Sequence, residues 1–204
     1  MFTSLITEKN VVFVGPSPYL MGQNKGTSID KFDTVIRANS GFPCKFISDY
    51  GSRCDILYSN RLWSRVMTDD ILDSYIGEVK MIVFKFLEQD IKQKCINHEK
   101  YFRLRQLPKN IVKMESNPNL GVLLINDILN FKPKTLTLMG MDFYEDENNK
   151  YYEGYHSPEL IEKTKIEMHD LEENTNQIKK LIEKNEHVII LDDFIKNKIK
   201  TVGV

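Results

Sequence analysis

Short apolar segments rich in β-branched residues alternate with helical segments along most of the chain, and this alternation restricts the fold more than any other feature. The first segment, at 11–14, is continuously apolar and stops at Gly15-Pro16, which is typical of a buried parallel strand ending in a sharp turn. Similar patterns predict strands at 34–37, 55–59, 79–86, 111–114, 135–139 and 187–191. We therefore expect an α/β fold with a mainly parallel sheet flanked by helices.

Helices are predicted between these strands, at 62–75, 90–97, 121–130 and 157–184. The last is the longest: Ser157 can cap its N-terminus, and Pro158 suits the first helical position. Apolar or small residues then recur every three or four positions, so one face is expected to pack on the sheet. The chain has no internal repeat, low-complexity tract or flexible linker, and we expect a single domain over residues 1–204.

The composition excludes several classes of protein. A chain of 204 residues with 41% hydrophobic positions can bury a full core. Its 28 basic and 29 acidic side chains give a net charge of -1, which argues against a nucleic acid partner. The apolar runs fall short of the roughly 20 residues of a membrane span, and residues 1–10 lack a signal-peptide pattern. Three cysteines without zinc spacing fit a reducing compartment, so we expect a cytoplasmic protein.

Candidate binding residues follow the predicted strands, where an open parallel sheet binds its ligands. Gly15 and Ser17 lie in a small-residue turn that allows a nucleotide to approach the backbone, although the dinucleotide and Walker spacings are absent. Asn39 follows the 34–37 strand, and residues 119–121 open a helix whose amides suit a phosphate. Each pattern taken alone also fits an ordinary turn or helix cap.

A second group of candidates follows the 135–139 strand. Tyrosine hydroxyls in this group can bind phosphate oxygens, and their rings can stack on a base. A polar, partly exposed loop is the alternative interpretation, because the intervening segment 145–150 is strongly polar. The residues of this group are Gly140, Asp142, Tyr144, Tyr151 and Tyr152.

His169 and Glu173 form the candidate acid–base pair. On the predicted 157–184 helix they lie one turn apart, so the carboxylate can orient the imidazole or raise its basicity. A solvent-facing histidine is the simpler interpretation of the spacing alone. The chain has neither the Asp-x-Asp pair of metal-dependent sugar transfer nor the Gly-x-Ser-x-Gly elbow of a serine hydrolase.

Taken in order, several of these segments resemble the family 29 sialyltransferases. Segments 11–20, 26–30 and 32–39 resemble the large sialyl motif, and 51–58 is similar to the segment that follows it. The stretch from 117–121 through 136–140 resembles the small sialyl motif, while 151–153 and His169 are similar to the two short C-terminal motifs. Segment 140–144 is also similar to a strand end in the bacterial family 42 sialyltransferases. The resemblance spans residues 10–190 and implies a Rossmann-like fold that varies the GT-A type.

The resemblance implies an inverting, metal-independent glycosyltransferase that moves sialic acid or a related sugar from a CMP-sugar donor to a glycan hydroxyl. No cofactor and no metal site are expected. Ser17 and Asn39 are implied to contact the nucleotide, and Tyr151 or Tyr152 the leaving phosphate. His169 is implied as the general base, with Glu173 beside it. The remaining implied or expected donor-binding residues are Gly15, Asn60, Asn119, Leu120, Gly121, Gly140, Asp142 and Tyr144.

The chain departs from the family pattern at three positions. Pro16 replaces an asparagine, Lys150 replaces the histidine before the paired tyrosines, and Asn174 replaces a glutamate five residues after the base. The cysteine pair and membrane anchor of the secretory enzymes are also absent, which fits a cytosolic microbial or viral relative. Two alternatives stay open: an inactive nucleotide- or glycan-binding relative, and a transferase with another nucleotide-sugar donor. The acceptor and the oligomeric state are not encoded in any pattern.

Overall fold

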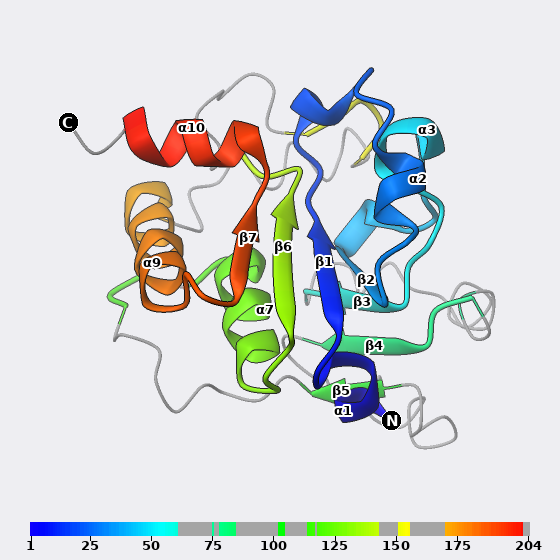
Figure 1. Cartoon of the computed structure of the whole chain (residues 1–204), viewed down its shortest axis with the longest axis horizontal. Coiled ribbons are helices and arrows are strands. Elements are labelled where there is room, and N and C mark those ends of the chain that lie inside the picture. The colour runs from blue at the N-terminus through cyan, green and yellow to red at the C-terminus, as the bar shows by residue number, and fades with distance from the viewer. Residues whose placement is uncertain are drawn as a thin grey trace.

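The computed structural model describes residues 1–60, 75, 78–84, 102–104, 114–116, 118–142, 151–155 and 170–201. In this part of the chain seven strands form one sheet in the order β5-β4-β3-β2-β1-β6-β7, and every neighbouring pair is parallel (Figure 1). The predicted α/β class with a parallel sheet is therefore confirmed. The strands are β1 (Asn10–Val14), β2 (Thr34–Ala38), β3 (Ile56–Ser59), β4 (Met81–Phe84), β5 (Phe102–Leu104), β6 (Thr135–Met139) and β7 (Ile189–Leu191).

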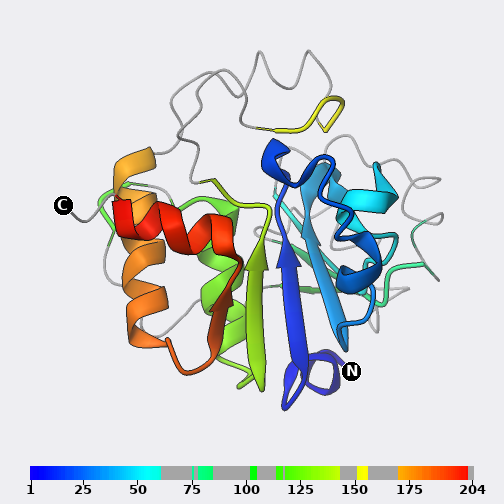
Figure 2. The ribbon, with the colours of Figure 1, turned by 45° about the horizontal axis from the view of Figure 1, so that its top comes forward.

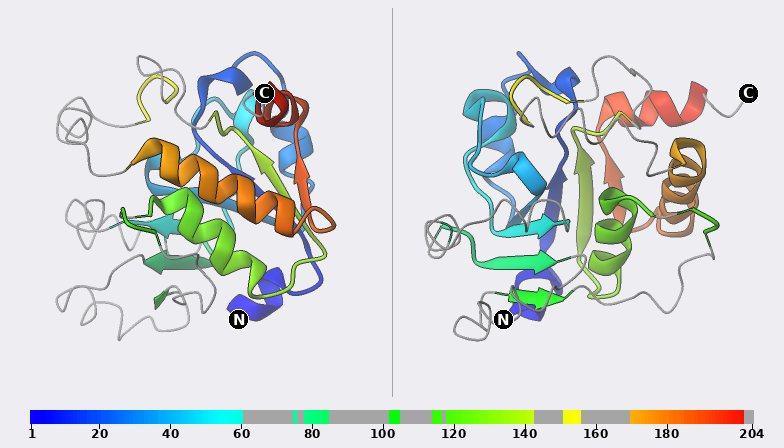
Figure 3. Two further views of the ribbon diagram at one scale, coloured as in Figure 1. Left: turned by 90° about the vertical axis from the view of Figure 1, so that its left-hand side faces the viewer. Right: turned by 180° about the vertical axis from the view of Figure 1, so that it is seen from behind.

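Helices cover both faces of the sheet. On one face α7 and α9 lie side by side, as both views of Figure 3 show, and on the other face lie the short helices α2 and α3. No helix in the described part of the chain is long and apolar enough to cross a bilayer. The helices are α1 (Phe2–Ile6), α2 (Gly26–Ile29), α3 (Ile47–Tyr50), α7 (Leu120–Leu129), α9 (Leu171–Lys184) and α10 (Asp193–Thr201), with the 3₁₀ turns η1 (Pro18–Leu20) and η2 (Asn39–Gly41).

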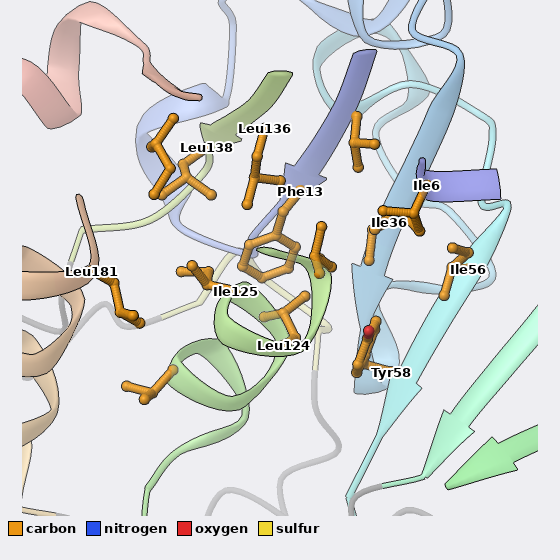
Figure 4. Close-up of a cluster of buried hydrophobic side chains, with 14 of the residues drawn as sticks. Ile6, Phe13, Ile36, Ile56, Tyr58, Leu124, Ile125, Leu136, Leu138 and Leu181 are labelled. Carbon is orange, nitrogen blue, oxygen red and sulfur yellow. The ribbon is translucent and has the colours of Figure 1, made fainter. Parts of the chain in front are cut away.

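The continuous apolar run of β1 is explained by burial on both of its faces. Successive side chains of a strand point to opposite sides, so Phe13 packs in the cluster formed with α7 and α9 (Figure 4). Val12 and Val14 point the other way, into the cluster that contains residues of α2 and α3. A strand with apolar residues at every position is stable only where helices cover both faces.

The predicted helix at 157–184 is interrupted at Asp170. Its described part, α9, starts at Leu171, and Asp170 before it has extended backbone with φ -69° and ψ 110°. The Asp170 carboxylate accepts the amide of Glu173 at 2.8 Å, which satisfies a free N–H of the first turn and places negative charge at the helix N-terminus. Continuous helix through position 170 was therefore a wrong prediction, while the predicted end at Lys184 is confirmed. The proposed cap Ser157 lies outside the described residues.

Other element predictions differ from the structure at the edges of the sheet. The predicted strand at 111–114 falls mostly outside the described residues, and Met114 lies in no strand. The edge strand is instead β5, which no sequence pattern predicted, and α10 after β7 was also not predicted. The predicted helices at 62–75 and 90–97 lie outside the described residues, apart from Tyr75.

The strand order reverses between β1 and β6. From β1 the sheet extends through β2 to β5 on one side, and through β6 and β7 on the other. The carboxyl ends of β1 and β6 lie next to each other at one edge of the sheet, as Figure 2 shows. Loops that leave two such strands in opposite directions open a crevice between them, and this is where parallel α/β sheets bind their ligands.

Candidate functional site

A pocket opens at this reversal point, at the carboxyl ends of β1, β2 and β6. The pocket is partly open to solvent, and it is lined by backbone and side chains that follow these strands. The predicted donor-binding residues that line it are Gly15, Ser17, Asn39, Asn119, Leu120, Gly121, Gly140, Asp142 and Tyr151. The pocket thus brings together residues from five separate segments of the chain. Tyr144, a further prediction, lies outside the described residues.

The floor of the pocket is backbone from the ends of β1 and β6. The Gly15 amide donates to the Met139 carbonyl at 2.8 Å, and the Ser17 amide donates to the Gly140 carbonyl at 2.9 Å. Gly140 has φ +69°, a conformation that glycine adopts without strain. Because these amides already have protein partners, the floor offers a ligand close contact rather than hydrogen-bond donors.

Tyr19 holds the backbone that follows β6 in place. Its hydroxyl accepts the Gly140 amide at 2.7 Å and donates to the Asp192 carboxylate. The ring stacks on Phe194 of α10 at a centroid distance of 3.9 Å. Burial, followed by the hydrogen bond to Asp192, raises the pKa of Tyr19 above its usual range, so the hydroxyl stays protonated. Sequence analysis did not identify this contact, which connects α10 to the floor of the pocket.

Asn39 stands at the end of β2 in a left-handed backbone conformation, with φ +46°. Its Oδ1 accepts the backbone amide of Asn60 at 3.0 Å. Within the described residues its Nδ2 has no hydrogen-bond partner, so this donor is available to a ligand in the pocket. Asn60, which was predicted as a donor contact, is not among the pocket-lining residues; its backbone instead anchors Asn39.

The first turn of α7 presents backbone amides to the pocket. Asn119 is the N-cap, and its Oδ1 accepts the Val122 amide at 2.9 Å. Leu120 and Gly121 line the pocket, and their amides have no protein partner in the described part of the chain. Unpaired amides at a helix N-terminus attract an anion through hydrogen bonding and the helix dipole.

Two residues of α9 hold the segment that leads into α7. The Glu173 carboxylate accepts the amides of Glu115 and Ser116 at 2.8 and 2.9 Å, and hydrogen bonds from Ser116 and then Glu115 hold its pKa below the usual range. The Oδ1 of Asn174 accepts the amide of Asn119 at 2.7 Å. Glu173 is not a lining residue of the pocket. Its predicted partner His169 lies outside the described residues, and this pairing stays a prediction.

The paired tyrosines take different positions. Tyr151 lines the pocket and stacks on Tyr155, at a centroid distance of 5.0 Å, while the Tyr155 hydroxyl donates to the Ala38 carbonyl at 2.6 Å. Tyr152 is 5% exposed and packs on Tyr50, and burial raises its pKa to about 12. Of the two, Tyr151 is therefore the one placed to reach a ligand. The pocket-lining residues that were not predicted as site residues include Met141, Tyr155, Thr175 and Ile178. Met141 and Tyr155 lie close to predicted site residues, whereas Thr175 and Ile178 follow only the helical periodicity of α9.

The described lining of the pocket carries little formal charge. Asp142 is its one acidic residue, and no lysine, arginine or histidine is present among the described lining residues. Among these described residues, the groups that can bind a negatively charged ligand are backbone amides, side-chain amides and tyrosine hydroxyls, which act as fixed dipoles.

The sequence matches the family model described as glycosyltransferase family 29 (sialyltransferase) over residues 7–150, which is more than half of the chain. No curated protein matches the chain in sequence.

Solved structures of sialyltransferases share the fold at low sequence identity. The Campylobacter jejuni enzyme CstII in complex with the substrate analogue cytidine-5'-monophosphate is 16% identical, over 91% of this chain and 80% of that one, with a TM-score of 0.62. A mammalian sialyltransferase in complex with Gal-beta-1-3GalNAc-ortho-nitrophenol is 16% identical, over 93% and 71%, with a TM-score of 0.62. The monofunctional alpha-2,3-sialyltransferase Cst-I from Campylobacter jejuni is 20% identical, over 92% and 77%, with a TM-score of 0.61. The predicted sialyltransferase-like fold is confirmed.

Proposed function

Because the chain belongs to glycosyltransferase family 29, the sialyltransferases, we propose that it transfers a sugar from a CMP-activated donor to a glycan hydroxyl. The observation that carries the proposal is the pocket at the β1–β6 reversal, where the α7 amides, Asn39 and Tyr151 converge. The complex of CstII with cytidine-5'-monophosphate supports cytidine phosphate as the donor's nucleotide. The sugar is proposed to be sialic acid or a related acid, and the product to have inverted anomeric configuration.

Five of the described pocket residues have a proposed role in holding the donor. Asn39 donates its Nδ2 to the nucleotide, while the amides of Leu120 and Gly121 bind an anionic group. Tyr151 donates to the phosphate, and this bond strengthens as the phosphate gains charge on leaving. Gly15 in the floor lets the nucleotide lie directly against backbone. These contacts orient the donor so that its anomeric carbon faces the acceptor.

His169 is the proposed general base. It accepts the proton of the acceptor hydroxyl as that oxygen bonds to the anomeric carbon, while the carbon–oxygen bond to phosphate breaks and CMP leaves. An imidazole with an ordinary pKa of about 6.5 suits this step near neutral pH, and general base catalysis contributes roughly 10²–10⁴-fold. The lack of an Asp-x-Asp pair in the sequence supports a reaction that needs no divalent metal.

A direct test is the release of CMP from CMP-sugars in the presence of glycan acceptors. The wild-type chain is expected to release CMP from CMP-sialic acid or a close relative in an acceptor-dependent way. His169→Ala is expected to lower kcat by about 10²–10⁴-fold. His187→Ala is the matched control, because His187 is exposed in the turn before β7 and is expected to leave the rate unchanged. No CMP release from any CMP-sugar by the folded protein would contradict the proposal.

A non-catalytic binding protein is the second candidate, and Pro16 is the observation that favours it. Pro16 lines the pocket and has no backbone N–H, so one donor contact is missing there. Calorimetry distinguishes the candidates, because a binding protein would take up CMP without turnover. Thermal shifts with CMP, UDP and GDP separately identify the nucleotide, since a ligand at 100 times its dissociation constant adds about 2.7 kcal/mol of stability.

A further inference from the structure

We infer that Asn174 is a positioning residue for donor binding, because its side-chain amide fixes the turn whose backbone amides receive an anionic group of the donor. The inference rests on the proposed function and assigns to α9 a part in it. Asn174 itself does not line the pocket, so it acts through Asn119.

Both the oxygen and the nitrogen of the Asn174 side-chain amide form hydrogen bonds. It is 1% exposed; its Oδ1 accepts the Asn119 amide and its Nδ2 donates to the Asp170 carbonyl, each at 2.7 Å. Asp170 is the N-cap of α9, and Asn119 is the N-cap of α7. One buried side chain therefore sets the spacing between the N-termini of two helices that lie side by side (Figure 3).

The backbone amide and the side-chain Oδ1 of Asn119 both form hydrogen bonds within the protein. Its backbone amide is taken by Asn174, and its Oδ1 is taken by Val122 in the first turn of α7. The turn is thus held from both sides, and the amides of Leu120 and Gly121, which have no partner among the described residues, are presented to the pocket in a fixed direction. Donors held in place before a ligand arrives bind it with less loss of conformational entropy.

The neighbouring contact of Glu173 has a different consequence. Glu173 holds the amides of Glu115 and Ser116, which do not line the pocket, whereas Asn174 holds Asn119, which does. We therefore assign to Glu173 a role in stabilising the loop at 115–116, and to Asn174 a role in ligand affinity. An anion at the α7 N-terminus is either the donor phosphate or the carboxylate of an acidic sugar, since both present oxygen atoms to amide donors.

The test measures the affinities of cytidine, CMP and a non-transferable CMP-sialic acid analogue by calorimetry. For Asn174→Ala we expect cytidine affinity to be unchanged and the affinity for the anion-bearing ligand to fall about tenfold, the scale of one hydrogen bond. If the phosphate binds at the N-terminus of α7, the variant should lose affinity for both CMP and the analogue. If the carboxylate binds there, the variant should lose affinity for the analogue but not for CMP. Asn174→Leu, which keeps the buried volume, carries the same expectation should the alanine variant fail to fold.

Asn185→Ala is the matched control. Asn185 Nδ2 donates to the Leu181 carbonyl at 2.7 Å at the far end of α9, so this variant loses a similar bond without touching the α7 turn. It is expected to lower stability and to keep all three affinities. Equal loss of all three ligands in Asn174→Ala, or no loss of any, would overturn the inference while the proposed function stands. A wild-type chain that binds no CMP would overturn the proposed function itself.

Discussion

Gly15 and Gly140 approach each other so closely that neither position has room for a side chain. A β-carbon on Gly15 would lie 2.4 Å from the Gly140 carbonyl oxygen, and one on Gly140 would lie 2.3 Å from the Gly15 carbonyl oxygen. The two glycines follow adjacent parallel strands at the point where the strand order reverses. Their contact draws the two strand ends together and forms the floor on which a ligand can lie against backbone.

Gly140→Ala is expected to destabilise the fold more than a glycine substitution with the same backbone conformation elsewhere. Gly140 and Gly22 both have positive φ, at +69° and +75°, but nothing lies within 4 Å of a β-carbon on Gly22. Gly22→Ala should therefore cost only the left-handed strain, about 1–2 kcal/mol. Gly140→Ala adds a backbone clash of roughly 1–3 kcal/mol. Urea denaturation measures both, and equal losses would contradict the proposed contact.

Asn39→Asp is expected to weaken ligand binding while leaving the stability of the fold nearly unchanged. The aspartate keeps the oxygen that accepts the Asn60 amide, but it loses the Nδ2 donor and adds a negative charge to the pocket proposed to hold an anionic donor. We expect kcat/KM for the CMP-sugar to fall by about 10–100-fold, the scale of a hydrogen bond to a charged group, with the melting temperature within a few degrees of wild type. Steady-state kinetics and calorimetric melting check the two halves. Unchanged kinetics would remove Asn39 from the donor site.

Substitution of the paired tyrosines by phenylalanine is expected to distinguish their roles. Tyr151→Phe removes a hydroxyl at the pocket and should lower kcat/KM by about 10–100-fold through loss of a bond to the leaving phosphate. Tyr152→Phe keeps the ring that packs on Tyr50 and should leave kcat/KM within about threefold. The reverse ranking in a CMP-release assay would mean that Tyr152 turns toward the donor.

Glu173→Gln is expected to change the pH dependence of stability in acid. The folded-state pKa of Glu173 is lowered, by hydrogen bonds from Ser116 and then Glu115, so the carboxylate stabilises the fold above its unfolded pKa near 4.5. The wild type should therefore be more stable than the glutamine variant at pH 7, and this difference in stability should disappear as the pH falls below about 4.5 and through the lowered folded-state pKa. Unfolding measured between pH 3 and pH 7 tests it. Glu172→Gln removes a charge from an exposed neighbour in the same turn and serves as the control for the charge change itself.

Removal of divalent metals is expected to leave the reaction rate unchanged. The chain lacks an Asp-x-Asp pair, and the proposed donor contacts are amides and hydroxyls. CMP release should be equal in the presence of EDTA and of added Mg²⁺ or Mn²⁺. A rate that falls with EDTA and recovers with one metal would show that a metal supplies the stabilisation assigned to these dipoles. Thermal melting with and without EDTA separates a catalytic from a structural metal.

Sequence patterns predicted the parts of this structure that depend on local periodicity. The apolar run at 11–14 indicated a strand covered on both faces, and β1 lies between two layers of helices. Gly15, Asn39 and Gly140 were predicted as site residues because each follows such a strand, and in a parallel sheet those ends meet at one edge. A continuous apolar run and a position after a strand are properties of a few neighbouring residues, and they can be recognised without the fold.

The tertiary structure alone decided which residues meet across the chain. Tyr19 and Asp192 are 173 positions apart, and Asn119 and Asn174 are 55 positions apart. No local pattern distinguishes these side chains from exposed ones of the same type, because their partners are set by how strands and helices pack. The same reason explains why adjacent Tyr151 and Tyr152 differ, one lining the pocket and the other buried against Tyr50. Local sequence selects the elements, but burial and hydrogen-bond partners arise only once the layers are assembled.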